Sequence, residues 1–154
     1  MGLEIERKFL IKSDDWKPLV INSFSIKQGY LNLAPKRTVR VRIQEKNAFI
    51  TIKGKTKGIT RVEFEYTIPF QEAKQLILLS EGSLIEKIRH KVKYEGNVWE
   101  IDVFSGTNEG LIIAEIELQS ETQSIEIPSW LGKEVSNDSR YYNANLVKNP
   151  YSSW

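Results

Sequence analysis

Glu4-Ile5-Glu6-Arg7-Lys8-Phe9-Leu10-Ile11 is the stretch of this 154-residue chain from which its fold can be inferred. In an extended strand the side chains alternate between two faces, so Glu4, Glu6 and Lys8 share one face. Ile5 and Phe9 share the other. Two carboxylates at this spacing repel each other, and each raises the other's pKa unless a cation lies among them. The interpretation therefore depends on how often the chain repeats the pattern.

Further segments with the same alternation are expected along the whole chain, nearly all of them joined by hairpin turns. They span residues 23–33, 37–44, 48–54, 59–68, 83–94, 98–105 and 111–119. Pro69 suits the first turn of a helix, and the apolar residues after it predict a helix over 69–80. A final helix is expected from residue 138 or 139 to about 147. The sequence thus predicts a mainly β (α+β) protein.

Length and composition limit the class of protein. A chain of 154 residues fits one domain, expected over 1–154, and a net charge of +2 does not favour a nucleic-acid or membrane partner. With no cysteine and only His90, disulfides and multi-histidine zinc sites are excluded, so a metal site would use carboxylates. We see no signal peptide and no apolar run long enough to span a bilayer, so we expect a cytoplasmic protein.

Charged residues gather on one face of most of these strands, opposite aliphatic residues. The carboxylates on the charged faces are Glu4, Glu6, Glu63, Glu65, Glu100, Asp102, Glu115 and Glu117. The cations are Lys8, Arg40, Arg42, Lys53, Arg61, Lys87, Arg89 and Lys91. Residues of the same sign recur as neighbours on one face, as in Arg40-x-Arg42, so acidic and basic blocks are separate.

Two arrangements of the strands satisfy this pattern. In an open sheet, the apolar face would rest on helices and the charged face would be solvated. In an eight-stranded antiparallel closed barrel, the charged faces would line a tunnel that holds a small ligand, with a few helices packed outside. The alternation alone fits both. The same-sign blocks favour the tunnel, because like charges side by side cost free energy unless ions are bound between them.

The separated blocks also indicate a chemistry. Carboxylates suit Mg²⁺ or Mn²⁺, whereas arginine and lysine suit the oxygens of a polyanion such as a phosphate chain. Phosphoryl transfer depends largely on positioning and charge neutralisation, which this set of residues could supply. The residues by themselves therefore suit metal-dependent phosphoryl transfer.

The chain resembles the CYTH superfamily, the triphosphate tunnel metalloenzymes, in a series of blocks that follow the order of that family. The blocks are Glu4-x-Glu6-x-Lys8, Gln28-Gly29-Tyr30-Leu31, Arg40-Val41-Arg42, Thr51-Ile52-Lys53-Gly54, Glu63-Phe64-Glu65, Lys87-Ile88-Arg89, Trp99-Glu100-Ile101-Asp102, Ala114-Glu115-Ile116-Glu117-Leu118 and Asp138-Ser139-Arg140-Tyr141-Tyr142-Asn143-Ala144-Asn145-Leu146. The resemblance implies an eight-stranded tunnel that hydrolyses the terminal phosphate of a linear triphosphate with Mg²⁺ or Mn²⁺. The compact chain favours inorganic tripolyphosphate, because no separate domain is available to recognise an organic group.

The resemblance also implies roles for individual residues. The metal ligands would be Glu4, Glu6, Glu115 and Glu117, supported by Glu63, Glu65, Glu100 and Asp102. The phosphate-binding residues would be Lys8, Arg40, Arg42, Lys53, Lys87, Arg89 and, at one end, Arg140. The catalytic residues would be Lys8, Glu6, Glu117 and Tyr30. The alternation puts Tyr30 on the face of Phe24 and leaves its direction open. The helix over 138–147 would close or flank one end.

Other functions remain open from the sequence. A class IV adenylate cyclase, or a thiamine or nucleoside triphosphatase, would use the same fold. A non-catalytic polyphosphate-binding module would bind triphosphate without turnover, and an open sheet would be a protein-interaction surface. The partner expected is a small polyanionic substrate, and a homodimer is left open.

Overall fold

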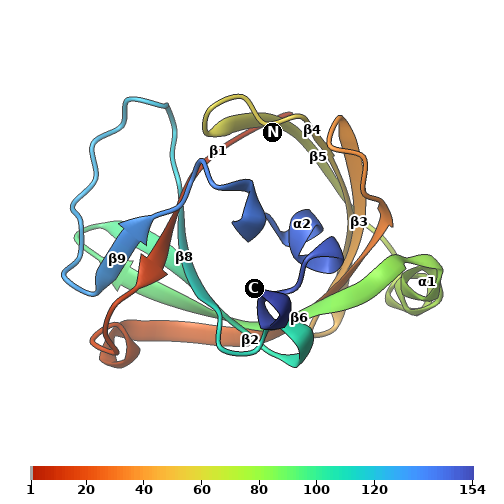
Figure 1. Ribbon diagram of the computed structural model, residues 1–154, viewed down its shortest axis with the longest axis horizontal. Helices are drawn as coiled ribbons and strands as arrows, with labels where there is room; N and C mark the ends of the chain where they lie inside the picture. Colours follow the sequence, from red (N-terminus) through yellow and green to blue (C-terminus); the bar gives the residue numbers. More distant parts are fainter. Residues whose placement is uncertain (1) are drawn as a thin grey trace.

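Eight β-strands close into an antiparallel barrel in the computed structural model, which describes residues 2–154 (Figure 1). The strands of the ring are β1 (Gly2–Ile11), β2 (Val20–Asn32), β3 (Arg37–Gln44), β4 (Asn47–Gly54), β5 (Thr60–Thr67), β6 (Glu81–Tyr94), β7 (Asn97–Phe104) and β8 (Ile112–Glu117). The barrel and its antiparallel pairing confirm the predicted fold class. The alternative prediction of an open sheet is wrong.

Closure of the ring depends on β1, which pairs with strands on both of its edges. Its first residues pair with β5, with Glu4 opposite Arg61, and its later residues pair with β8, with Glu6 opposite Glu117. Strand β9 (Leu131–Glu134) pairs with the end of β1 and is not part of the ring. The sequence analysis did not predict this ninth strand.

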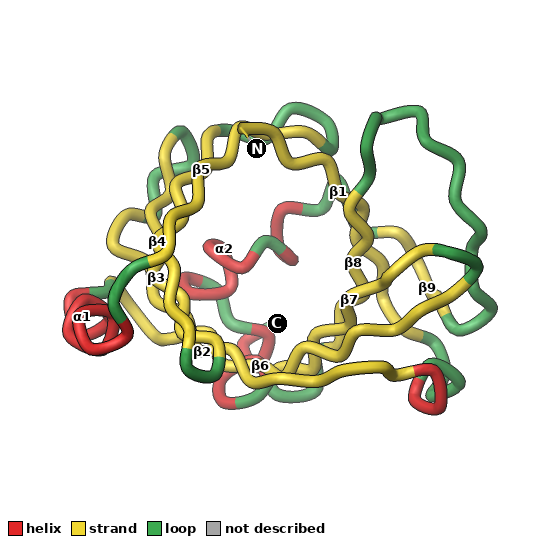
Figure 2. Tube along the Cα trace, turned by 180° about the vertical axis from the view of Figure 1, so that it is seen from behind, coloured by secondary structure: helices red, strands yellow, loops and turns green. Residues whose placement is uncertain are grey.

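The helices are shorter than predicted, and they occupy different places. Helix α1 (Phe70–Leu76) lies outside the barrel and continues as a 3₁₀ turn through Leu79. Helix α2 (Asn143–Lys148), by contrast, lies within the outline of the ring when the barrel is viewed end-on (Figures 1 and 2). The expected helix over 138–147 is divided because Tyr142 is extended, with φ −70° and ψ 133°, between a 3₁₀ turn and α2.

One apolar cluster, which contains Trp99, lies outside the barrel wall, and a second, which contains Ile85 and Leu146, packs α2 against the inner face of β6. Trp99 on β7 is fully buried and packs edge-on against Trp130, with ring centroids 5.7 Å apart. Trp16 is buried in the same cluster. The segment between β8 and β9 loops out over this side of the molecule (Figure 1). No helix among residues 2–154 combines the length and the apolar character that a membrane crossing requires.

Candidate active site

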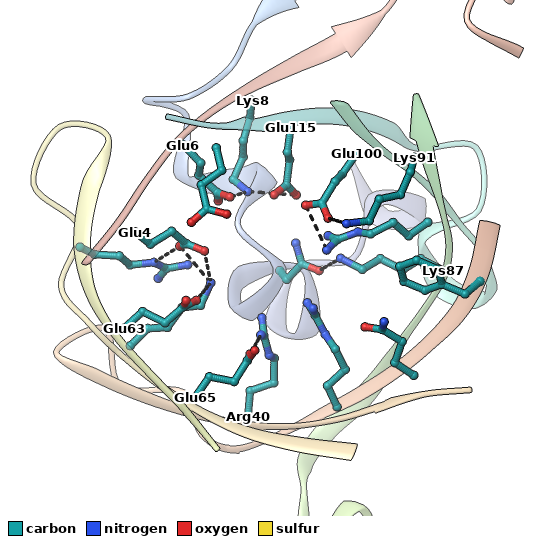
Figure 3. A pocket seen from close by; sticks show the side chains of 18 of the residues that line it. Glu4, Glu6, Lys8, Arg40, Glu63, Glu65, Lys87, Lys91, Glu100 and Glu115 are labelled. Carbon is teal, nitrogen blue, oxygen red and sulfur yellow. Dashed lines mark hydrogen bonds and ion pairs between the residues drawn. The ribbon is translucent and has the colours of Figure 1, made fainter. Parts of the chain in front are cut away.

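The charged strand faces surround a cavity of about 220 Å³ inside the barrel (Figure 3). Its acidic lining residues are Glu4, Glu6, Glu63, Glu65, Glu100, Glu115 and Glu117. Its basic lining residues are Lys8, Arg40, Arg42, Lys53, Arg61, Lys87, Arg89 and Lys91. Phe24, Tyr30, Gln44 and Asn143 complete the lining. The structure thus brings together most of the residues that the sequence analysis selected.

The acidic side of the cavity is assembled by strand register. Glu6 on β1 is directly opposite Glu117 on β8, and Glu115 on β8 is directly opposite Glu100 on β7. Residues in such pairs have Cβ atoms about 4.5–5.5 Å apart, so their side chains interact. Carboxylates that are distant in the sequence therefore point into one space.

Two lysines neutralise part of this acidic side. The Lys8 Nζ lies 2.9 Å from the Glu6 Oε1 and 3.3 Å from the Glu115 Oε1. The Lys53 Nζ donates to both carboxylate oxygens of Glu4, at 3.0 and 3.2 Å. Although burial opposes the charge of Glu4, Lys53 is the main group that lowers the pKa of this carboxyl to about 2. These ion pairs keep Glu4 and Glu6 ionised.

Other carboxylates on this side lack enough positive charge around them. Burial and the charges of Glu4 and Glu6 raise the pKa of Glu117 above its usual value. Burial and the charge of Glu4 raise the pKa of Glu63 in the same direction. An additional cation would relieve this repulsion, and carboxylate oxygens are the donors that Mg²⁺ and Mn²⁺ prefer. The donor set therefore fits a divalent cation, although within residues 2–154 no three acidic groups are already arranged as a metal site.

The basic side consists of Arg40 and Arg42 on β3 and Lys87 and Arg89 on β6. Burial, together with the charges of Arg40 and Arg89, lowers the pKa of Arg42 to about 9. Burial is also the main cause that lowers the pKa of Lys87 to about 7, and the charges of Arg89 and Arg42 add to it. Crowded, desolvated cations of this kind are stabilised by a bound anion. The basic side therefore fits a phosphate group.

Asp102 is not among the residues that line the cavity. It is fully buried, and its oxygens accept hydrogen bonds from Arg89 at 2.8 and 2.9 Å. The Lys87 Nζ lies 2.7 Å from the Asp102 Oδ2. The predicted metal ligand thus lies behind two cations and holds them in place, because strand register puts Arg89 directly opposite it.

Arg140 is also placed away from the cavity. Its guanidinium forms an ion pair with Asp138, 2.9 Å from Nη2 to Oδ2, and lies 4.8 Å from the centre of the Trp154 ring. Asp138 also accepts a hydrogen bond from the backbone N–H of Arg140, so the turn that begins at Asp138 directs the arginine outward. The structure does not bring Arg140 to the predicted phosphate site.

Tyr30 does line the cavity, which settles the direction that the alternation left open. It is directly opposite Arg40 in the β2–β3 register, and Phe24 of the same face also lines the cavity. The face shared by Phe24 and Tyr30 is therefore the inner face of β2.

Besides Gln44, two polar residues of the site were not selected from the sequence, Gln28 and Asn143. The Gln28 Oε1 accepts a hydrogen bond from the Arg42 Nε at 2.9 Å, and the Gln28 Nε2 donates to the Asn143 Oδ1 at 3.0 Å. Both residues occur in blocks that carry the family resemblance, which was the only signal available for them. Their role depends on how α2 packs against the barrel, which alternation along the strands does not reveal.

A closed barrel whose interior is acidic on one side and basic on the other fits a polyanion together with cations in a tunnel. The CYTH domain family matches residues 2–151. The chain therefore belongs to the CYTH family.

Known relatives agree with this assignment. The chain is 46% identical over 155 residues to a protein of Acetivibrio thermocellus named inorganic triphosphatase, with 100% of this chain and 99% of that protein covered. It is 34% identical over 149 residues to an inorganic triphosphatase of Nitrosomonas europaea, covering 94% and 96% of the two chains. A crystal structure of an inorganic triphosphatase matches with a TM-score of 0.66 and 32% identity, covering 94% of this chain and 97% of that one.

A more distant structure shares the fold alone. A protein of Pyrococcus horikoshii has a TM-score of 0.60 and 20% identity, with 77% of this chain and 79% of that chain covered.

Proposed function

We propose that this protein hydrolyses the terminal phosphate of inorganic tripolyphosphate with Mg²⁺ or Mn²⁺. The observation that carries the proposal is the opposition of an acidic and a basic side across one cavity inside the barrel. The names of the two relatives that match nearly the whole chain support the choice of substrate.

The acidic and basic sides of the cavity would have different roles. The basic side would bind the phosphate oxygens, with bidentate contacts from arginine and point charges from lysine. The acidic side would hold the divalent cation, through Glu4, Glu6, Glu63, Glu65, Glu100, Glu115 and Glu117. When bound, the cation would supply charge neutralisation and a nucleophilic water at neutral pH.

Lys8 and Lys53 lie among the carboxylates of the acidic side. Each bonds carboxylates in this structure, and each carries a charge that could be shared with a phosphate oxygen. Burial opposes the charge of Lys8, but Glu115 and Glu6 more than compensate and raise its pKa, so Lys8 stays protonated. We therefore assign Lys8 to phosphate binding and transition-state stabilisation, not to proton transfer. Tyr30 is assigned a place near the phosphates through its position opposite Arg40.

Replacing Arg42 by alanine is expected to weaken the binding of tripolyphosphate about tenfold or more, because a charge-assisted contact to the anion is lost. The loss should shrink as the salt concentration rises, since screening already weakens the wild-type contact. Titration calorimetry at low and high salt measures both effects. Arg37→Ala, on the same strand but exposed, is the matched control. Equal affinities of wild type and Arg42→Ala would remove Arg42 from the site.

A substrate panel tests the proposed reaction. Tripolyphosphate, ATP and thiamine triphosphate are each incubated with Mg²⁺ or Mn²⁺, and phosphate and cyclic AMP are measured. We expect phosphate release to be fastest from tripolyphosphate and to stop when EDTA is added. Cyclic AMP as the main product from ATP would replace the proposal by an adenylate cyclase. Binding without turnover under all conditions would indicate a polyphosphate-binding module.

A further inference from the structure

Lys87 is held from two directions at the wall of the cavity. Its side chain is 1% exposed, and its Nζ lies 2.7 Å from the Asp102 Oδ2 and 2.9 Å from the Asn143 Oδ1. In its protonated form the Lys87 amine has three N–H donors, so these two acceptors leave one donor for a ligand in the cavity. Asn143 therefore fixes the direction in which Lys87 can offer its remaining N–H.

The same asparagine oxygen also reaches Arg42, through Gln28. Gln28 is fully buried, donates from Nε2 to the Asn143 Oδ1, and accepts at Oε1 from the Arg42 Nε. This arrangement uses only one of the five N–H donors of the guanidinium. The Nη groups of Arg42, which lines the cavity, are thereby left for an anion.

Asn143 can serve both cations because α2 is anchored to the barrel. Asn143 is the first residue of α2, whose Leu146 and Val147 are buried in a cluster with Tyr30 and Ile85. Close packing requires a glycine at position 82, where φ is +67° and a Cβ would lie 2.6 Å from the Val147 Cγ1. Since the helix is fixed at this point, the amide of Asn143 is also fixed.

We propose that Asn143 is a positioning residue for substrate binding, which acts through Lys87 and, by way of Gln28, through Arg42. Its carbonyl oxygen has two lone pairs, and both are used by these donors. The C-terminal helix thus orients the cations of the basic side before the phosphate chain arrives. This lowers the free-energy cost of ordering their side chains on binding. This inference rests on the proposed function for the identity of the ligand.

Asn143→Ala tests the inference, with Asn145→Ala as the matched control. Asn145 belongs to the same helix, but its Nδ2 donates to the Ser139 backbone oxygen at 2.7 Å, away from the cavity. We expect Asn143→Ala to raise the Kd for tripolyphosphate, measured by calorimetry with EDTA present, about ten- to a hundredfold. The kcat/KM should fall by a similar factor, and Asn145→Ala should leave both unchanged. Unchanged binding by Asn143→Ala would overturn the proposal.

A double-mutant cycle separates positioning from a general effect on the fold. If Gln28 and Asn143 act as one unit, the double variant Gln28→Ala/Asn143→Ala should lose less affinity than the product of the two single losses. Losses that simply multiply would overturn the coupling. If Asn143→Ala does not fold, Asn143→Ser replaces it, because serine is polar but too short to reach both donors. Wild-type protein that binds tripolyphosphate without hydrolysing it would contradict the proposed function, and the calorimetric comparison would still decide the role of Asn143.

Discussion

Glu117→Gln is expected to reduce the kcat/KM for tripolyphosphate about a hundredfold or more, while the thermal stability of the protein stays the same or rises. Glu117 lines the cavity directly opposite Glu6 and forms no ion pair with any residue in 2–154. Loss of a carboxylate that holds the cation should be at least as severe as loss of the groups that support metal ligands, which costs about 10–100-fold.

Although Glu117→Gln is expected to lower activity, it is not expected to lower stability. Burial and the neighbouring carboxylates raise the pKa of Glu117, which means that its ionised form is disfavoured in the folded protein. A neutral glutamine of the same shape removes this repulsion at neutral pH. A carboxylate that binds a cation, and that destabilises the folded protein when no cation is bound, should behave in this way.

Steady-state kinetics over a range of Mg²⁺ concentrations and a melting curve in EDTA measure the two effects. Glu126→Gln, an exposed carboxylate in the segment between β8 and β9, is the control and should alter neither. Activity equal to wild type at low Mg²⁺ would exclude Glu117 as a ligand. A clear fall in melting temperature would show instead that Glu117 stabilises the fold.

Asp102→Asn is expected to lower the free energy of unfolding by about 3–5 kcal/mol, because it removes the one negative charge that both buried cations, Lys87 and Arg89, contact. Asp102 is fully buried and bonds both Arg89 and Lys87. These cations hold its pKa well below the usual value, although burial acts in the other direction. The stabilisation is therefore fully present above the pKa of an unfolded aspartate. It is lost as the pH falls from that value through the lowered pKa of Asp102 in the folded protein.

Urea denaturation at neutral pH measures this loss. Asp138→Asn is the control, since it makes the same chemical change in an exposed ion pair with Arg140 and should leave the midpoint nearly unchanged. A loss for Asp102→Asn no larger than that of the control would show that the buried network does not support the basic side.

The sequence was sufficient to identify the charged faces, because alternation along a strand is a local property. Glu4, Glu6 and Lys8 could be assigned to one face without knowledge of their neighbours, and all three line the cavity. The number of strands in the ring also followed from the repeated alternation, but their order did not, since β2 pairs with β6 and β1 lies between β5 and β8. The family resemblance then indicated that these faces point inward.

Other features depended on contacts between distant parts of the chain. Alternation could not distinguish an open sheet from a barrel, because closure requires β1 to pair with β5. Nor could it show that Asp102 supports Arg89 from behind while Glu100, two residues earlier on the same face, lines the cavity.

By itself, the sequence determined which side chains share a face and what charge each face carries, since both depend only on the two-residue period of an extended strand. Only the tertiary structure decided which acidic and basic groups meet. It also decided that Asn143 lines the cavity, whereas Arg140, three residues earlier, points away from it. The physical reason is that strand register and the packing of α2 on β6 are set by long-range contacts, which no local pattern records.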